Sequence, residues 1–325
     1  MKKILYRFDA NQKIGFGHLI RCCQLAKEFK KKKIQNIFYG DVKDIDNSFF
    51  RKYFQKVIKV KSSDVINETN NIIRIHKKFK CNLLVLDKFN SSNKMRKIFK
   101  KNNIKWFEFI KNKDMLNLPT YGICSIPYKN TKINFSKDKI YLGKNYSVLR
   151  DQFYKKKSVK TKNYIFINSG GGNDKGSIIF ILKKVLPLLS KIRIFLLVGN
   201  NSSLPKIKEW IKNNDKKKMI KILLNKENII NYIDQSLFAI CSGGTISHEI
   251  DSRSKRMMIF SITKNQVLQS KNWENFGHHY LGKFQNIKNI KFKKIFQNIK
   301  KLREKKFKVR RKYYLKVINN ILREI

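Results

Sequence analysis

The stretch KILYRFDANQKIGFGHLIRCCQLAKEFK, residues 3–30, decides the fold. Its apolar run 3–8 predicts a short buried strand, and Gly15 and Gly17 then lead into an amphipathic segment. Over residues 18–32, apolar side chains recur at helical spacing on one face. A strand, a glycine-containing turn and a helix are the first half of a β-α-β unit, the building block of parallel sheets.

Short apolar runs and longer amphipathic segments alternate along most of the chain. We expect strands at 3–8, 35–40, 56–60, 82–87 and 104–109, and again at 163–169, 192–199, 221–224, 237–242 and 257–262. We expect helices at 18–32, 64–79 and 91–101, and again at 177–189, 205–213, 226–235, 245–252 and 266–276. The pattern is lost around 111–160, where Pro119, Pro127 and a lysine-rich stretch indicate a boundary.

This organisation predicts an α/β protein with two Rossmann-like domains that face a cleft, a size that 325 residues accommodate. We expect an N-terminal domain over 1–155 that carries a catalytic histidine and a C-terminal nucleotide-binding domain over 156–290, followed by a basic helical tail over 291–325. Ligands of such sheets bind beyond the carboxyl ends of the strands. The glycine-rich elements all fall at such ends and are expected to converge on one cleft.

The composition excludes several classes of protein. Apolar residues make up 42% of the chain, which excludes intrinsic disorder despite a net charge of +52. The excess lysine is spread along the sequence and accompanies many Asn and Ile residues, which is typical of AT-rich codon usage, although a polyanion partner or an anionic substrate is also compatible with it. No zinc-finger, RRM or KH pattern is present, so no specific nucleic-acid partner is expected.

Five cysteines do not make a disulfide framework, and no apolar run reaches the ~20 residues of a membrane span. We therefore predict a cytoplasmic protein and expect a monomer. His278 and His279 lack further ligands at metal spacing, so we predict no metal site.

His18 is the first candidate for chemistry. It lies at the start of the first predicted helix in the string Gly15-x-Gly17-His18-x-x-Arg21, which is not a dinucleotide fingerprint because residue 20 is isoleucine. A helix N-terminus disfavours imidazolium, so a histidine there stays neutral and can accept a proton. A capping or buried histidine is the alternative.

Three further elements could contact a phosphate or a sugar. Gly171-Gly172-Asn173-Asp174 lies between a strand and a helix, and Ser177 stands where an ATP-binding P-loop needs lysine. Gly243-Gly244-Thr245 leads into a predicted helix whose amides could bind a pyrophosphate, and Glu249, one turn later, could accept hydrogen bonds from ribose hydroxyls. Asn265-Gln266 follows the last predicted strand and could contact the sugar or a phosphate. Each element alone is also compatible with an ordinary turn or polar loop.

Together, these elements resemble a known family, the UDP-2,4-diacetamido-2,4,6-trideoxy-β-L-altropyranose hydrolases of pseudaminic acid biosynthesis. The resemblance covers about residues 1–285. It is carried by Arg7-x-Asp9-Ala10, the string from Gly15 to Arg21, Leu84-Val85-Leu86-Asp87, Gly171-Gly172-Asn173-Asp174, Gly243-Gly244-Thr245-x-x-x-Glu249 and Asn265-Gln266. Phe89 departs from the pattern, because the family usually has tyrosine there.

The resemblance implies the glycosyltransferase B fold of MurG and hydrolysis of a UDP-sugar to free sugar and UDP, without cofactor or metal, for pseudaminic acid that decorates flagellin. It implies His18 as the base that activates water. The implied substrate-binding residues are Arg7, Asp9, Gly15, Gly17, Arg21, Asp87, Gly171, Gly172, Asn173, Asp174, Gly243, Gly244, Thr245, Glu249, Asn265 and Gln266. A UDP-sugar-dependent glycosyltransferase of the same fold is the main alternative, and a polyanion-binding protein is the third.

Overall fold

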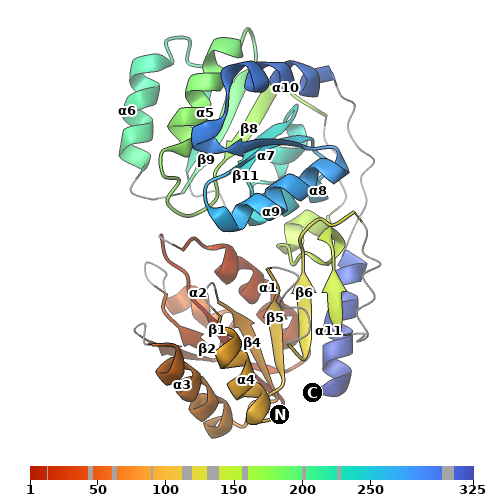
Figure 1. Ribbon diagram of the computed structural model, residues 1–325. Coiled ribbons are helices and arrows are strands. Elements are labelled where there is room, and N and C mark those ends of the chain that lie inside the picture. Colours follow the sequence, from red (N-terminus) through yellow and green to blue (C-terminus); the bar gives the residue numbers. More distant parts are fainter. Residues whose placement is uncertain are drawn as a thin grey trace. The chain divides into compact units, whose positions relative to one another are not determined.

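The computed structural model describes residues 1–12, 14–42, 47–60, 64–88, 91–111, 119–129, 139–155, 160–199, 203–224, 228–301 and 311–325. The chain divides into two compact α/β units (Figure 1). The first unit comprises Met1–Ile126, Asn130–Arg150 and Arg311–Ile325, and the second comprises Pro127–Lys129 and Asp151–Arg310.

The first unit is built on a seven-stranded parallel sheet in the order β3-β2-β1-β4-β5-β6-β7. Its strands are β1 Lys3–Phe8, β2 Gln35–Gly40, β3 Lys56–Lys59, β4 Leu83–Asp87, β5 Trp106–Phe109, β6 Tyr121–Cys124 and β7 Ile140–Leu142. Its helices are α1 Gly17–Lys31, α2 Asn47–Arg51, α3 Val65–Lys78, α4 Asn93–Lys101, the short 3-10 helix η2 Lys144–Tyr146 and α11 Arg311–Glu324.

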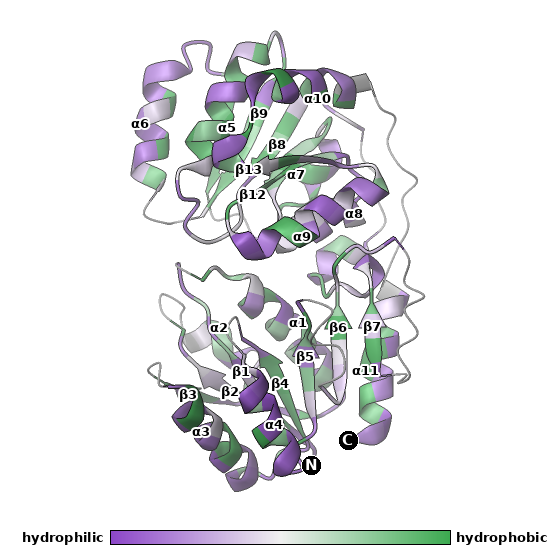
Figure 2. Cartoon of the chain, viewed as in Figure 1, coloured by the Kyte–Doolittle hydropathy of each residue, from purple (hydrophilic) through white to green (hydrophobic). Residues whose placement is uncertain are grey.

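Both faces of this sheet are buried, because successive side chains of a strand point to opposite sides. Leu5 of β1 packs in one cluster with Ile72 of α3 and Phe99 of α4. Tyr6, the next residue of β1, lies edge-on against Phe54, with ring centroids 5.2 Å apart. Each large apolar side chain buried in this way contributes about 1.5–3 kcal/mol. The hydrophobic strands and the hydrophilic outer residues of α4 are visible in Figure 2.

The second unit contains a six-stranded parallel sheet in the order β10-β9-β8-β11-β12-β13. Its strands are β8 Tyr164–Asn168, β9 Arg193–Val198, β10 Ile220–Leu224, β11 Ala239–Ser242, β12 Met257–Ser261 and β13 His279–Lys283. Its α-helices are α5 Ser177–Val185, α6 Leu204–Asn214, α7 Ile230–Gln235, α8 Thr245–Ser252, α9 Lys264–Asn272 and α10 Asn289–Lys301.

The predicted fold class, an α/β protein with two parallel sheets, is confirmed. All ten predicted strands are present, with ends that differ from the prediction by at most two residues. Among the described strands and α-helices, four were not predicted: α2, β6, β7 and β13. No helix among the described residues is long and apolar enough to cross a membrane.

The two helices expected in the basic tail do not form a unit of their own. Helix α10 belongs to the second unit, where Phe296 lies edge-on against Phe238 with ring centroids 5.4 Å apart. Helix α11 belongs to the first unit and buries Tyr314 and Ile321 there. The hydroxyl of Tyr314 donates a hydrogen bond to the carbonyl of Gln24 in α1, at 3.3 Å.

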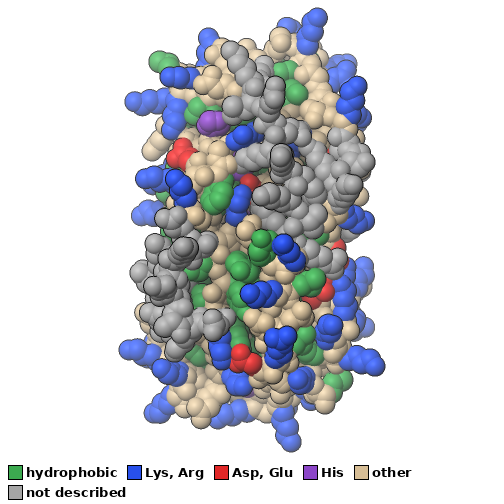
Figure 3. All heavy atoms as spheres, turned by 90° about the vertical axis from the view of Figure 1, so that its right-hand side faces the viewer, with side chains coloured by type: hydrophobic (Ala, Val, Ile, Leu, Met, Phe, Trp, Pro, Cys, Tyr) green, Lys and Arg blue, Asp and Glu red, His purple; other side chains and the backbone are tan. Residues whose placement is uncertain are grey.

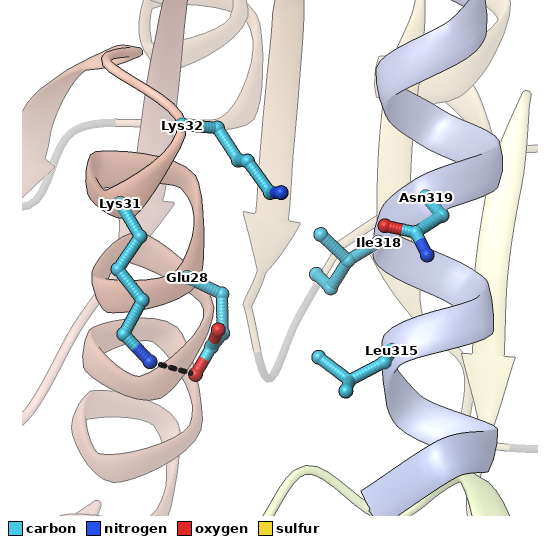
Figure 4. Close-up of a pocket in the computed structure, with 6 residues that line it drawn as sticks. All are labelled: Glu28, Lys31, Lys32, Leu315, Ile318 and Asn319. Atoms are coloured by element: carbon cyan, nitrogen blue, oxygen red, sulfur yellow. Dashed lines mark hydrogen bonds and ion pairs between the residues drawn. The ribbon is translucent and has the colours of Figure 1, made fainter.

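A hollow of about 360 Å³ lies between α1 and α11 in the first unit (Figure 4). Lys31 of α1 donates to the carboxylate of Glu28 at 2.8 Å, and Lys32, the residue after α1, also lines the hollow. Leu315 and Ile318 of α11 supply the apolar wall. On the face shown in Figure 3, Lys and Arg side chains are scattered over the visible surface and do not form one stripe.

Candidate functional site

His18, Arg21 and Asp87 meet at the carboxyl end of the first sheet. Phe8, the last residue of β1, pairs with Asp87, the last residue of β4, and α1 begins shortly after β1 ends. His18 and Arg21 are three residues apart and therefore share one face of α1. His18 Nδ1 lies 2.8 Å from Asp87 Oδ1 and 2.9 Å from the Asp87 backbone oxygen. Arg21 donates from Nε to Oδ2 at 2.5 Å and from Nη2 to Oδ1 at 2.6 Å.

These contacts determine the tautomer of His18. A carboxylate and a carbonyl can only accept hydrogen bonds, and both lie closer to Nδ1 than the donor Arg21 Nη2 at 3.2 Å, so Nδ1 carries the hydrogen and donates it to Asp87. The basic nitrogen is then Nε2, which has no hydrogen-bond partner among the described residues, in a side chain that is 11% exposed. The arrangement is that of a histidine whose second nitrogen is available to take a proton.

Electrostatics keep this imidazole neutral at pH 7. Burial lowers the pKa of His18, and the nearby cations Arg21 and Lys111 lower it further, while the Asp87 carboxylate acts in the opposite direction. From the sequence we expected the helix N-terminus to keep His18 neutral. In the structure, burial is the larger cause of the lowered pKa of His18.

Asp87 is an ionised carboxylate within the protein interior. Burial alone would raise the pKa of Asp87, but Arg21 and His18 outweigh burial and hold the pKa well below its usual range. Arg21 also stacks over the ring of Phe109, with 4.9 Å from the guanidinium carbon to the ring centroid. Both contacts fix the guanidinium in one orientation.

Arg7 and Asp9 form a separate network beside this group. Arg7 is buried, and it donates from Nε to Glu68 Oε1 at 2.7 Å and from Nη1 to Asp9 Oδ1 at 2.5 Å. Asp9 Oδ1 also accepts the backbone N–H of Asp41 at 2.8 Å. Lys88 contacts the other oxygen of Glu68. The structure therefore places Arg7 and Asp9 in contacts within the protein that anchor the loop before α1.

The two glycines of this loop have different positions. Gly15 has a φ of +90° and closes a turn by donating to the carbonyl of Asn11 at 2.7 Å. Only glycine adopts this backbone region without strain. Gly17 is the first residue of α1. Phe89, where the family pattern has tyrosine, lies outside the described residues.

In the second unit, three predicted segments meet at the carboxyl edge of the sheet. They follow β8, β11 and β12, which are neighbours in the sheet. Ser242 Oγ donates to the carbonyl of Ser169 at 2.8 Å and so joins the turn at Gly171-Gly172 to the turn at Gly243-Gly244. Asn265 and Gln266 lie in the first turn of α9, where Gln266 Oε1 accepts the N–H of Ile262 at 2.8 Å.

Gly243 is packed too closely against Ser270 of α9 to carry a side chain. Its amide donates to the carbonyl of Phe260 at 3.0 Å and is therefore not available to a phosphate, contrary to the sequence expectation. A Cβ at Gly243 would lie 1.8 Å from Ser270 Oγ. Gln269 Nε2 donates to the carbonyls of Gly243 at 2.8 Å and Gly244 at 3.2 Å, a contact that the sequence did not suggest. The amides that can face a ligand are those of Thr245 and Ile246 at the start of α8, because the Ser247 amide donates to the Gly244 carbonyl at 3.1 Å.

Asn173, Asp174 and Glu249 differ in exposure. Asp174 is fully buried, and its Oδ2 accepts the N–H of Ile178 in α5 at 2.9 Å, so this carboxylate caps a helix. Asn173 is exposed, and its Oδ1 accepts the N–H of Lys175 at 2.8 Å. Glu249 is buried in α8. No group of three or more His, Cys, Asp or Glu that could hold a metal ion occurs in the described part of the chain.

Two parallel-sheet units, each with glycine-containing turns at the carboxyl ends of its strands, define a protein of the glycosyltransferase B type. MurG of Acinetobacter baumannii is similar over 100% of both chains, with a TM-score of 0.65 and 11% identity. The Staphylococcus aureus protein MnaA, solved with UDP, has a TM-score of 0.64 and 12% identity over 100% of this chain and 98% of that one. These likenesses show the fold.

A curated protein is similar in sequence. The UDP-2,4-diacetamido-2,4,6-trideoxy-β-L-altropyranose hydrolase of Campylobacter jejuni is 26% identical over 281 residues, which are 81% of this chain and 93% of that protein. This similarity confirms the resemblance seen in the sequence motifs and the prediction that the chain is an enzyme. No protein-family model matches the chain.

Proposed function

We propose that the chain hydrolyses a UDP-sugar to free sugar and UDP, and that the sugar is 2,4-diacetamido-2,4,6-trideoxy-β-L-altropyranose or a close relative. The observation that carries the proposal is His18, whose Nδ1 is bound to the buried Asp87 and whose Nε2 is available as a base. The similarity to the Campylobacter jejuni hydrolase supports the substrate class.

The proposed step needs one base and a good leaving group. His18 Nε2 takes a proton from water while the water oxygen forms a bond to the anomeric carbon. The bond between that carbon and the β-phosphate oxygen breaks, and its electron pair leaves with UDP. A single displacement of this kind inverts the anomeric carbon. Asp87 stabilises the imidazolium that forms, as the carboxylate behind a catalytic histidine does elsewhere.

We assign binding of the UDP moiety to the second unit. The amides of Thr245 and Ile246, at the start of α8, have no hydrogen-bond partner among the described residues and carry partial positive charge, which favours a pyrophosphate. The hydroxyl of Thr245 stands at the same end of this helix and is partly exposed. Gly171, Gly172 and Gln266 border this turn and would contact the phosphates or the sugar.

The test is release of UDP from a panel of UDP-sugars without any acceptor, followed by proton NMR of the sugar product. The panel includes the diacetamido-trideoxy-altropyranose compound. We expect release of UDP and free sugar with inverted anomeric configuration. Release of UDP only when an acceptor sugar or lipid is added would identify a glycosyltransferase instead. The free sugar that we expect would supply pseudaminic acid synthesis.

The variant His18→Ala tests the base. We expect turnover to fall by about 10²–10⁴-fold while UDP binding persists, because a general base contributes a factor of that size. His76→Ala is the matched control, since His76 is a partly buried histidine of α3 in the same unit. Undiminished turnover in His18→Ala would show that His18 is not the base.

A further inference from the structure

Lys111 is a partly buried cation held against the strand end that carries Asp87. It comes shortly after β5, the neighbour of β4 in the sheet. Its Nζ donates to the backbone carbonyl of Lys88 at 2.7 Å. The preceding carbonyl, that of Asp87, lies 2.9 Å from His18 Nδ1. At the end of β4, the Asp87 carbonyl therefore contacts His18, and the next carbonyl, that of Lys88, contacts Lys111.

Charged side chains from four elements, α1, β4, α4 and β5, lie around the carboxyl end of β4. Arg21 of α1 pairs with Asp87 of β4 at 2.5 Å. Arg96 of α4 pairs with Glu108 of β5 at 2.6 Å, and both of these side chains are 2% exposed. Within each pair the two charges offset each other, and Lys111 adds a cation to the group.

Lys111 keeps its charge while His18 titrates. Burial lowers the pKa of Lys111 to about 8, with Asp87 and Glu108 opposing the fall and Arg21 and Arg96 adding to it. The pKa of His18 lies below its ordinary value of 6.5. Over the pH range in which His18 gains its proton, Lys111 is thus protonated, and its charge lowers the pKa of His18 throughout.

We infer that Lys111 is a positioning residue for His18. Its ammonium group holds the carboxyl end of β4, and with it the Asp87 acceptors, and its positive charge opposes protonation of the imidazole. This role could not be predicted from the sequence, because Lys111 is one of many lysines and lies outside the motifs. The inference deepens the proposed hydrolase function and rests on it for its catalytic consequence.

The experiment is a pH titration of the histidine ring signals by NMR, in the protein without substrate. The chain has five histidines, so selective histidine labelling gives few signals, and His18→Gln identifies the one that belongs to His18. In Lys111→Met we expect the pKa of His18 to rise by about 0.5–1 unit, less than the ~1–3 units of a charge in direct contact, because Lys111 is bound to the peptide that follows β4. Lys111→Arg keeps the charge and should keep the pKa.

Lys97→Met is the matched control, because it removes an exposed lysine from the neighbouring helix α4. It should leave the His18 titration unchanged. A His18 pKa in Lys111→Met that stays within about 0.2 unit of the original would overturn the inference, since a purely structural role does not move this titration.

The acid limb of UDP release, measured in parallel, should move to higher pH by the same amount as the His18 titration. The two proposals fail in different ways. A missing hydrolase activity leaves the NMR titration intact and removes only the catalytic consequence, whereas an unchanged titration in an active enzyme removes the role of Lys111.

Discussion

Replacement of Asp87 by asparagine is the sharpest test of the site in the first unit. Asp87 Oδ1 faces both His18 Nδ1 and Arg21 Nη2, and Oδ2 accepts from Arg21 Nε. All of these neighbours are donors, and an amide offers one oxygen and one NH₂ group. In Asp87→Asn, the NH₂ group must therefore face a donor of Arg21 or of His18, whichever way the amide turns.

The effect on turnover follows from the tautomer. An NH₂ group facing His18 leaves only the Asp87 backbone carbonyl to accept from Nδ1–H and so favours the tautomer with the hydrogen on Nε2, which cannot accept a proton from water. The loss of the carboxylate charge also lowers the pKa of His18 further, because Asp87 is the group that raises it. We expect the rate of UDP release under saturating substrate to fall by about 10²–10⁴-fold, the value of a general base.

The same change lowers stability, and this effect needs its own control. Loss of one partner from a buried ion pair costs about 3–5 kcal/mol, and the Arg21 side chain is 21% exposed, so we expect the lower end, about 3 kcal/mol. The pKa of Asp87 is depressed in the folded protein, so this stabilisation is present above the unfolded pKa of about 4 and is lost only as the pH falls below it. Urea unfolding at pH 7 measures it in full.

Asp234→Asn is the matched control in the second unit. Asp234 pairs with the buried Arg253 through bonds of 2.8 and 2.7 Å, and among the described residues this arginine is the only hydrogen-bond partner of its carboxylate. We expect Asp234→Asn to lower stability by a similar amount and to leave the rate under saturating substrate nearly unchanged. If Asp87→Asn loses stability as this control does, yet keeps its rate within about threefold, the role of Asp87 in orienting His18 is refuted.

Three further predictions use other parts of the structure. Gly243→Ala should weaken UDP binding at least about tenfold by calorimetry, because its Cβ would lie 1.8 Å from Ser270 Oγ; unchanged affinity would contradict this. Ile321→Ala, in the fully buried face of α11, should cost about 2–5 kcal/mol in urea unfolding. The rate of UDP release should fall as the pH drops through the His18 pKa, which lies below 6.5, and an acid limb centred above 7 would contradict the lowered pKa.

The sequence predicted the central strands of both sheets because these are buried on both faces and appear as continuous apolar runs. It also predicted the edge strands β3 and β10, but it did not predict the edge strand β13, or β6 and β7, which have four and three residues in the stretch 111–160 where the alternation is lost. Helix α2 has five residues, fewer than two helical turns. Segments this short contain too few side chains for a period to be recognised.

The residues of the candidate site could also be predicted only in part from the sequence. His18 and Arg21 belong to one helical turn, so their spacing alone places them together. Their contact with Asp87 joins residues 66 and 69 positions apart, and no local pattern predicts such a pairing. Glu68 was missed for this reason, because it lies in an ordinary amphipathic helix. Asp174 was predicted to bind substrate, and the sequence did not indicate that it is buried with Oδ2 accepting the N–H of Ile178 in α5.

The opposing effects on His18 explain why Asp87 is accompanied by cations. A base must be neutral before the reaction and protonated after it. A carboxylate that holds Nδ1–H also raises the imidazole pKa, and alone it would favour the charged form too early. Burial is the largest effect that opposes this rise in pKa, and Arg21 and Lys111 add to it, so His18 keeps its orientation and its ability to accept a proton.

Two variants together test the opposing effects of Asp87 and Lys111 on His18. Asp87→Asn should lower the pKa of His18 and Lys111→Met should raise it, because the two side chains carry opposite charges. The two titrations should therefore lie on either side of that of the unaltered protein. If both shifts had the same direction, a change in burial would be the common cause, and the electrostatic explanation of the neutral His18 would fail.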